Sequence, residues 1–292
     1  PILLVIVIVS IFVMQQRTPS TATITQGTPT KLTHMTLALD WTPNTNHTGI
    51  YVALAKGWYR DQDIDLQLLP YSSSVNPDTL VSTGKADVGI SSTESVVADY
   101  GVGQPVVSIA ALLQHNTSAL VVRADAGITS PRGLDGKIYG GFGAPYESAV
   151  VSAIIKHSGG TGKFKNVTLN IDSIEALKSK QIDFVWIYQG WEGIQAQREG
   201  IKLNEFYVTD NGIPDYYTPT IIAGPNEIKL KADLLKRFMV ATTRGYDFAR
   251  ANAKASAQML LDQNKGVFPD TGLVFASQDY LSPRYADVGR KW

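Results

Sequence analysis

The residue types that most often carry out chemistry are absent from this chain of 292 residues or scattered along it. Cysteine is absent, which excludes disulfides, thiolate metal ligands, cysteine nucleophiles and a lipid-modified cysteine near the amino terminus. The histidines have no metal-ligand spacing; they are His34, His47, His115 and His157. No phosphate-loop motif occurs, and the glycine cluster at 140–143 lacks the order of a dinucleotide-binding motif. The sequence therefore predicts a protein with no catalytic residues, no metal site and no cofactor.

A polar loop after the first expected strand has the composition of a binding site. It spans 40–47 with the sequence DWTPNTNH and combines a carboxylate, a large ring, amides and an imidazole. Loops at strand ends carry function more often than cores do. The predicted ligand contacts in this loop are Asp40, Trp41, Asn44 and His47. In the structural alternative, Asn46 only caps the next helix, the proline shapes the turn and the tryptophan packs.

A second candidate is the stretch SSTE at 91–94, which follows another buried strand. It places hydroxyl groups and a carboxylate at the amino end of a helix, where exposed backbone amides favour hydrogen-bond acceptors. We predict that Ser92 and Glu94 contact ligand. The alternative is that they only cap the helix.

The glycine-rich stretch GGFGAPYE at 140–147 is the third candidate. Its glycines would let backbone approach a ligand closely before a proline begins the next helix. We predict ligand contacts from Phe142, Tyr146 and Glu147. A tight turn with no contact to ligand is the alternative.

The fourth candidate is the aromatic stretch WIYQGWE at 186–192. Strand alternation would place Trp186 and Tyr188 on one face. Rings beside polar groups suit stacking on a flat ligand, so we predict that Trp186, Tyr188 and Trp191 contact it. The alternative is that these rings belong to the core.

Short apolar runs alternate with helix-length segments from Met35 onward, which is typical of an α/β fold with largely parallel strands. The expected strands include 35–39, 64–69, 88–90, 106–113, 119–123 and 220–223. The expected helices include 47–56, 77–83, 94–100, 145–157, 231–250 and 253–263. Side chains at the carboxyl ends of such strands line the crevices in which ligands bind.

Two segments of the chain repeat the same order of features. VSTGKADVGISS at 81–92 and LKSKQIDFVWIY at 177–188 both read as helix end, turn, aspartate and strand. The repeat predicts two similar lobes, each with a mainly parallel sheet flanked by helices. The predicted boundaries are 33–122 with 220–292 for lobe 1 and 123–219 for lobe 2. Two crossings, near 121–123 and 220–223, would form the hinge of a clamshell with an interlobe cleft.

Charge and the amino terminus indicate the setting in which the protein acts. Lysine and arginine total 26, as do aspartate and glutamate, so the net charge is zero and nucleic acid is not an expected partner. The apolar run at 2–14 and the polar tether behind it predict an export signal or an uncleaved membrane anchor within 1–32. A buried strand is the structural alternative. Either leading interpretation places the folded part outside the cytoplasmic membrane.

Four of these stretches together resemble a known protein family. LDWTPNTNHTGIYVALAKGWY, GKADVGISSTESV, GGFGAPYESAV and DFVWIYQGWEG are similar to solute-binding proteins of ABC importers that carry thiamine pyrimidine precursors. The resemblance covers about 33–281 and implies a type II periplasmic-binding-protein fold. It also implies that aspartate at position 63 takes a left-handed backbone conformation, since similar proteins usually have glycine there.

The resemblance further implies a ligand and partners. The ligand would be a flat heteroaromatic vitamin or precursor, such as a hydroxymethyl- or formylamino-pyrimidine, with riboflavin as an alternative. The partner would be an ABC permease, with the protein a monomer attached to the membrane through its amino-terminal segment. Fungal thiamine-pyrimidine synthases share the fold but carry a cysteine-rich motif that is missing here, so an enzyme is disfavoured. A tethered sensor domain is a further alternative.

Overall fold

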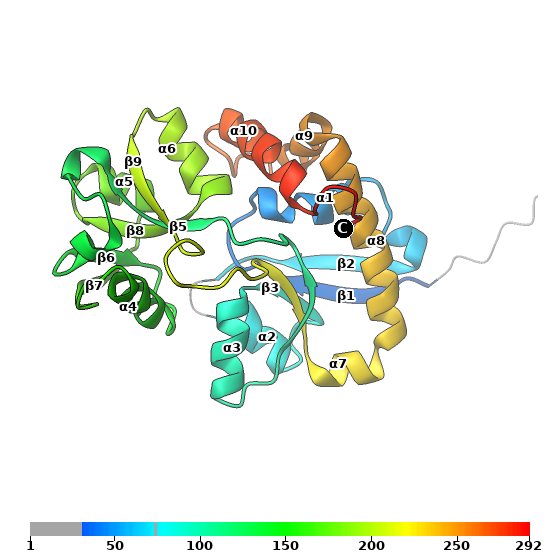
Figure 1. Cartoon of the computed structure of the whole chain (residues 1–292). Coiled ribbons are helices and arrows are strands. Elements are labelled where there is room, and N and C mark those ends of the chain that lie inside the picture. Colours follow the sequence, from blue (N-terminus) through cyan, green and yellow to red (C-terminus); the bar gives the residue numbers. More distant parts are fainter. Residues whose placement is uncertain (1–30, 73–74) are drawn as a thin grey trace, which may run out of the picture. The chain divides into compact units, whose positions relative to one another are not determined.

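Two five-stranded sheets form the framework of the protein (Figure 1). The computed structural model describes residues 31–72 and 75–292, and Leu32–Trp292 group into one unit that contains both sheets. The predicted signal or anchor at 1–32 lies almost entirely outside the described residues. Within 31–72 and 75–292, no helix has both the length and the apolar character needed to cross a bilayer.

The first sheet has the strand order β2-β1-β3-β10-β4. Its strands are β1 (Thr33–Ala38), β2 (Ile64–Leu69), β3 (Val88–Ser91), β4 (Val107–Ala111) and β10 (Thr220–Ala223). β1 pairs in parallel with β2 and β3, whereas β10 runs antiparallel to β3 and β4. The late strand β10 thus returns to a sheet built mainly from the first part of the chain, as predicted.

The second sheet has the equivalent order β7-β6-β8-β5-β9. Its strands are β5 (Ser118–Arg123), β6 (Ile138–Gly141), β7 (Lys165–Thr168), β8 (Phe184–Tyr188) and β9 (Leu203–Tyr207). β6 pairs in parallel with β7 and β8, and β5 runs antiparallel to β8 and β9. The mainly parallel α/β architecture with two similar halves is therefore confirmed.

The two aspartates of the sequence repeat have the same task in the two sheets. The Asp87 carboxylate, just before β3, accepts a hydrogen bond of 2.8 Å from the backbone N–H of Thr36 in β1. The Asp183 carboxylate, just before β8, accepts one of 2.8 Å from the backbone N–H of Ile138 in β6. Each aspartate ties the start of one central strand to its parallel neighbour.

The position of β5 corrects the predicted course of the chain. Because its strand was expected in lobe 1, the first crossing was placed near 121–123, but β5 pairs wholly within the second sheet. Both faces of β5 are apolar and buried, so its sequence suits either sheet. The segments that link the sheets are 112–117 and 208–219. The division into lobes otherwise stays a prediction.

Helices cover both faces of each sheet (Figure 1). They are α1 (Thr48–Ala55), α2 (Pro77–Ser82), α3 (Thr93–Gly101), α4 (Glu147–His157), α5 (Ser173–Lys178), α6 (Ile194–Arg198), α7 (Pro225–Leu230), α8 (Ala232–Ala251), α9 (Ala253–Gln263) and α10 (Thr271–Leu281). In β5, Leu120 and Val122 pack with α4, whereas Ala119 and Val121 pack with α5. This alternation is what a strand buried on both faces requires.

One local backbone prediction is also confirmed. Asp63, between a short 3-10 turn (Arg60–Gln62) and β2, has φ 54° and ψ 33°, which is left-handed. Aspartate tolerates this region better than most side chains do, because its short polar group bonds locally. Helices α6, α7 and α10 lie outside the predicted segments.

Candidate functional site

The loop after β1 is organised by a buried histidine. His47 ends a 3-10 turn (Thr45–His47), and its Nδ1 accepts a hydrogen bond of 3.3 Å from the backbone N–H of Asn44. Its Nε2 therefore carries the hydrogen and donates to Asp40 Oδ1 at 2.8 Å. Since both ring nitrogens are engaged, His47 acts on the site by orienting the half-exposed Asp40 carboxylate.

Asn44 takes the capping role that the structural alternative gave to Asn46. The Asn44 side-chain oxygen accepts a hydrogen bond of 2.9 Å from the backbone N–H of Asn46. Asn44 is buried, and its amide nitrogen donates to the Thr42 carbonyl at 3.1 Å. Its predicted contact with ligand stays a prediction.

Trp41 presents an aromatic surface next to Asp40. Its side chain is 44% exposed, and its ring centroid lies 4.7 Å from that of Tyr71. Burial and the nearby charge of Asp40 raise the pKa of Tyr71, which places the three groups together. Tyr71 was not predicted; its signal is an aromatic residue directly after the β2 strand, at the same end of the sheet as Trp41.

Ser92, at the start of α3, contacts a residue that follows the second sheet's strand β6. Its hydroxyl caps α3 by accepting a hydrogen bond of 3.1 Å from the backbone N–H of Ser95. The same oxygen lies 3.3 Å from the hydroxyl of Tyr146, at the start of α4. Capping and a role in the site are thus compatible in this residue.

Glu94 is the centre of a cluster of tyrosine hydroxyls. Its Oε1 accepts a hydrogen bond from Tyr216, which lies in the linking segment 208–219. The charge of Glu94 also contributes to raising the pKa values of Tyr146 and Tyr188, after burial as the main cause. Glu94 Oε2 is buried and has no hydrogen-bond partner among the described residues. Burial in turn raises the pKa of Glu94 itself.

Rings from the second sheet continue this cluster. The Tyr146 ring packs edge-on against Trp186, with centroids 6.3 Å apart, and against Phe142, with centroids 6.2 Å apart. Phe142 is 47% exposed and Trp186 only 6%. Trp186 belongs to the core beside Phe184, as the structural alternative held, but its indole N–H is buried without a partner among the described residues.

Glu147 faces its own loop. It is 1% exposed and accepts hydrogen bonds from the Tyr139 hydroxyl at 2.8 Å and from the backbone N–H of Phe142 at 3.0 Å, on Oε2. Its Oε1 accepts from the backbone N–H of Ala144. Both oxygens are occupied in this way, so the structure gives Glu147 an anchoring role, and a contact with ligand stays a prediction.

The glycines before Phe142 make room for the protein itself. A Cβ on Gly141 would lie 2.5 Å from Glu147 Oε2, and one on Gly140 would lie 2.7 Å from Ile182 Cδ1. Distances below 3 Å do not occur between real Cβ atoms and their neighbours. Close packing of the loop therefore accounts for both glycines.

The π-helical turn after β8 (Gln189–Gly193) separates the two predicted tryptophans. Trp191 packs on Phe268, with ring centroids 6.1 Å apart, in a cluster formed with α9 and α10. The Gln189 side-chain nitrogen is buried and unpartnered among the described residues. Burial raises the pKa of Glu192 to about 7, although Glu192 Oε2 accepts a hydrogen bond of 3.1 Å from the Tyr188 N–H.

The structure brings some of the predicted residues together and leaves the others in separate groups. Ser92, Glu94, Tyr146 and Tyr188 share one cluster with Tyr216, which was not predicted because a linking segment carries no motif. Over 31–72 and 75–292 no group of three or more histidine, aspartate or glutamate residues is arranged to hold a metal ion. The cluster offers aromatic faces and unpaired hydrogen-bonding atoms, which suits binding.

Residues 44–256 match the family described as NMT1/THI5 like. The chain belongs to the NMT1/THI5-like family. Three of the four sequence stretches that carry the predicted site lie inside this match. The match begins within the first stretch, so Asp40 and Trp41 precede it.

Individual relatives include a binding protein and a synthase. The formylaminopyrimidine-binding protein of Halalkalibacterium halodurans is 25% identical over 236 residues, covering 79% of this chain and 71% of the relative. The 4-amino-5-hydroxymethyl-2-methylpyrimidine phosphate synthase of Legionella pneumophila is 24% identical over 230 residues, covering 77% and 72%. The family therefore holds proteins named for binding and proteins named for synthesis.

A solved structure supports the fold alone. The alkanesulfonate-binding protein SsuA from Xanthomonas axonopodis pv. citri superposes with a TM-score of 0.66 at 9% identity, covering 85% of this chain and 83% of that protein. The predicted type II periplasmic-binding-protein fold is confirmed by this likeness and by the paired sheets.

Proposed function

We propose that this protein is the extracytoplasmic solute-binding component of an ABC importer and that it binds a flat pyrimidine precursor of thiamine. The observation that carries the proposal is the Glu94 cluster, in which Tyr216 donates to a carboxylate with an unpaired oxygen and the neighbouring Ser92 meets the hydroxyl of Tyr146 from the second sheet. Such a cluster is suited to close on a small ligand from two sides.

Aromatic surfaces favour a flat ligand. Trp41 and Phe142 expose large rings from the loops after β1 and β6, which are equivalent strands of the two sheets. Exposed aromatic faces at strand ends gain more from stacking on a planar ring than from facing water. A heteroaromatic ring held between such groups fits this arrangement.

The polar groups favour a ligand with both donors and acceptors. Asp40 and Glu94 supply carboxylate oxygens that accept hydrogen bonds from amino groups. Trp186 Nε1 and Gln189 Nε2 are buried donors without partners among the described residues, and a buried donor left unpaired costs about 1–3 kcal/mol. An aminopyrimidine carries exocyclic N–H donors beside ring-nitrogen acceptors and so satisfies both sets.

One argument favours the enzyme alternative, because the relatives include a synthase. The chain has no cysteine and so lacks the cysteine-rich motif of the fungal synthases that it resembles. The ligand is therefore expected to leave unchanged. Export, attachment through the amino-terminal segment, delivery to a permease and a monomeric state belong to the same proposal.

Titration calorimetry tests the proposal. The titrants are formylaminopyrimidine, 4-amino-5-hydroxymethyl-2-methylpyrimidine and riboflavin, with an alkanesulfonate as the control for a ligand of the shared fold. We expect saturable one-to-one binding of a pyrimidine, no binding of the alkanesulfonate and recovery of unaltered ligand by mass spectrometry. Binding of riboflavin alone would replace the pyrimidine assignment, and a stoichiometric product would overturn the binding-protein assignment.

A further inference from the structure

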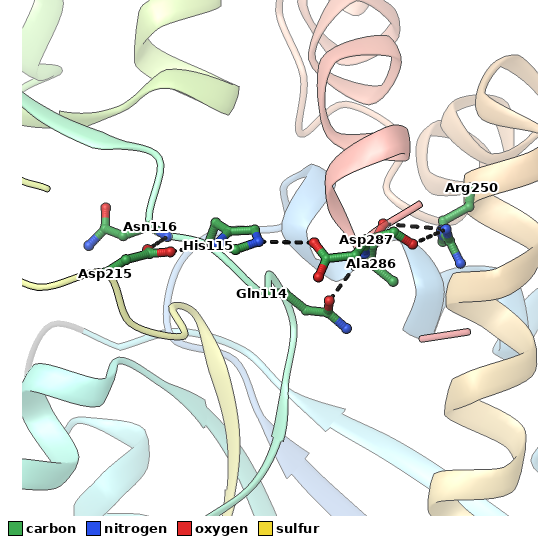
Figure 2. A network of polar contacts seen from close by, with 7 residues as sticks. All are labelled: Gln114, His115, Asn116, Asp215, Arg250, Ala286 and Asp287. Carbon is green, nitrogen blue, oxygen red and sulfur yellow. Dashed lines mark hydrogen bonds and ion pairs between the residues drawn. The ribbon is translucent and has the colours of Figure 1, made fainter. Parts of the chain in front are cut away.

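The two segments that link the sheets meet a third segment of the chain (Figure 2). They are the first linking segment 112–117, the second linking segment 208–219 and the carboxyl-terminal tail after the turn Ser282–Arg284. Figure 2 shows His115 between Asp215 of the second segment and Asp287 of the tail. One side chain thus joins all three segments.

The contacts of His115 require a charged ring. Its Nδ1 lies 2.5 Å from Asp215 Oδ2, and its Nε2 lies 2.9 Å from Asp287 Oδ1. Ionised carboxylates only accept hydrogen bonds, so both ring nitrogens must donate, and only the imidazolium form has two N–H groups. Hydrogen bonds to Asp215 and then to Asp287 accordingly raise the pKa of His115 above its ordinary value.

Asp215 connects this junction to the Glu94 cluster. Its Oδ1 accepts a hydrogen bond of 2.9 Å from the backbone N–H of Asn116. Although partial burial acts in the opposite direction, hydrogen bonds from His115, Asn116 and the backbone of Tyr216 lower the pKa of Asp215. The next residue, Tyr216, donates to Glu94 at the centre of the cluster. When Asp215 is held in place, the backbone of the adjacent Tyr216, which donates to Glu94, is held as well.

The tail that supplies Asp287 is itself held firmly. The Asp287 N–H donates to Gln114 Oε1 at 3.1 Å (Figure 2). Arg250 on α8 donates to the carbonyl oxygens of Ala286 and Asp287, both at 3.3 Å, and to that of Arg290 at 2.6 Å. Asp287 is thus a fixed point against which His115 holds the second linking segment.

We propose that His115 is a positioning residue for ligand binding, because its charged ring fixes Asp215 and thereby the Tyr216 that orients Glu94. This role rests on the proposed function of the Glu94 cluster. It makes the junction a pH-dependent support of the ligand site, located outside the site itself.

The direction of the pH dependence follows from the charges around the ring. Asp215 and Asp287 face His115, Arg290 lines the same cavity of about 370 Å³, and Arg250 binds the tail behind Asp287. Because a raised pKa means that the folded state favours the proton, the support is complete below the ordinary pKa of His115. It is lost as the pH rises through the raised value.

The test measures pyrimidine affinity by calorimetry at pH 6 and pH 9, with formylaminopyrimidine and 4-amino-5-hydroxymethyl-2-methylpyrimidine as probes. His115→Gln should weaken binding roughly twofold to fivefold at pH 6, as expected for exposed ion pairs, and much less at pH 9. His115→Arg, which keeps a charge at both values, should remove this part of the pH dependence. His34→Gln is the matched control, since His34 pairs with Asp65 at 3.8 Å on the exposed edge of β1 and β2.

A double-mutant cycle separates positioning from general structure. In a Tyr216→Phe background, His115→Gln should have no further effect on affinity, because the group through which it acts is gone. Additive effects, or a wild-type pH profile in His115→Gln, would overturn the inference while leaving the proposed function standing. Failure of the wild type to bind either pyrimidine would instead overturn the proposed function.

Discussion

The loops after β1 and β6 occupy equivalent places in the two sheets and are built on the same plan, yet they present opposite chemistry. In each, the residue that ends the loop accepts a hydrogen bond from the backbone N–H three residues earlier: His47 from Asn44, and Glu147 from Ala144. The Nε2 of His47 donates a second hydrogen bond to Asp40, which is half-exposed. Glu147 keeps its own charge inside the loop.

The difference shows where a charge can serve a ligand. A buried imidazole that bonds through both ring nitrogens supports a carboxylate that stays available. A buried carboxylate that already accepts from Tyr139 and the backbone serves its own loop. Each loop nevertheless exposes one large ring, Trp41 in the first and Phe142 in the second. We infer that the first loop contributes charge and stacking, and that the second contributes stacking alone.

The largest expected effect comes from removing the anchor of the second loop. Glu147→Ala leaves the buried Tyr139 hydroxyl and two partly buried backbone N–H groups unpaired. At about 1–3 kcal/mol for each unpaired group, the free energy of unfolding should fall by at least ~3 kcal/mol, measured by urea denaturation. Glu175→Gln, at an exposed helix position, is the control and should cost little. A stable Glu147→Ala protein that fails to bind ligand would show that this carboxylate faces the ligand after all.

The anchor of the first loop should affect binding instead. His47→Gln removes the ring that orients Asp40, so pyrimidine affinity should fall roughly tenfold, equivalent to about 1.4 kcal/mol. Asp40→Asn should weaken binding to a similar extent, and the double variant should be no weaker than either single one. Independent, additive losses from the two changes would contradict the supporting role of His47.

Much of the fold followed from the sequence because strand and helix patterns are local. The alternation in Ile64–Leu69 gave the bounds of β2, and the matched aspartates at 87 and 183 gave the repeat. The sheet to which β5 belongs depends on partners distant in sequence, so its residues did not reveal it. The loops of the site were predictable because they directly follow strands. Whether Glu147 or Trp191 faces the cleft was not, because a loop can turn a side chain either way.

A smaller effect concerns pH and the second half of the molecule. Burial raises the pKa of Glu192 to about 7 and also raises that of Glu147. A raised carboxyl pKa means that the unfolded state ionises first, so stability should fall as the pH rises from about 4.5 to 7. Urea denaturation at pH 5 and pH 8 measures this. Glu192→Gln should reduce the loss, and a wild-type pH dependence in that variant would assign the titration to another group.

Trp41→Ala tests the central claim, a flat ligand stacked on the exposed ring of the loop after β1, most directly. The ring is 44% exposed and packs mainly on Tyr71, so its removal should change the free energy of unfolding by no more than about 0.5–1 kcal/mol. Calorimetric titration with formylaminopyrimidine should nevertheless show affinity at least roughly tenfold weaker, as for an aromatic anchor at a binding site. Unchanged affinity in a folded Trp41→Ala protein would contradict the assignment of the ligand site to the loop after β1.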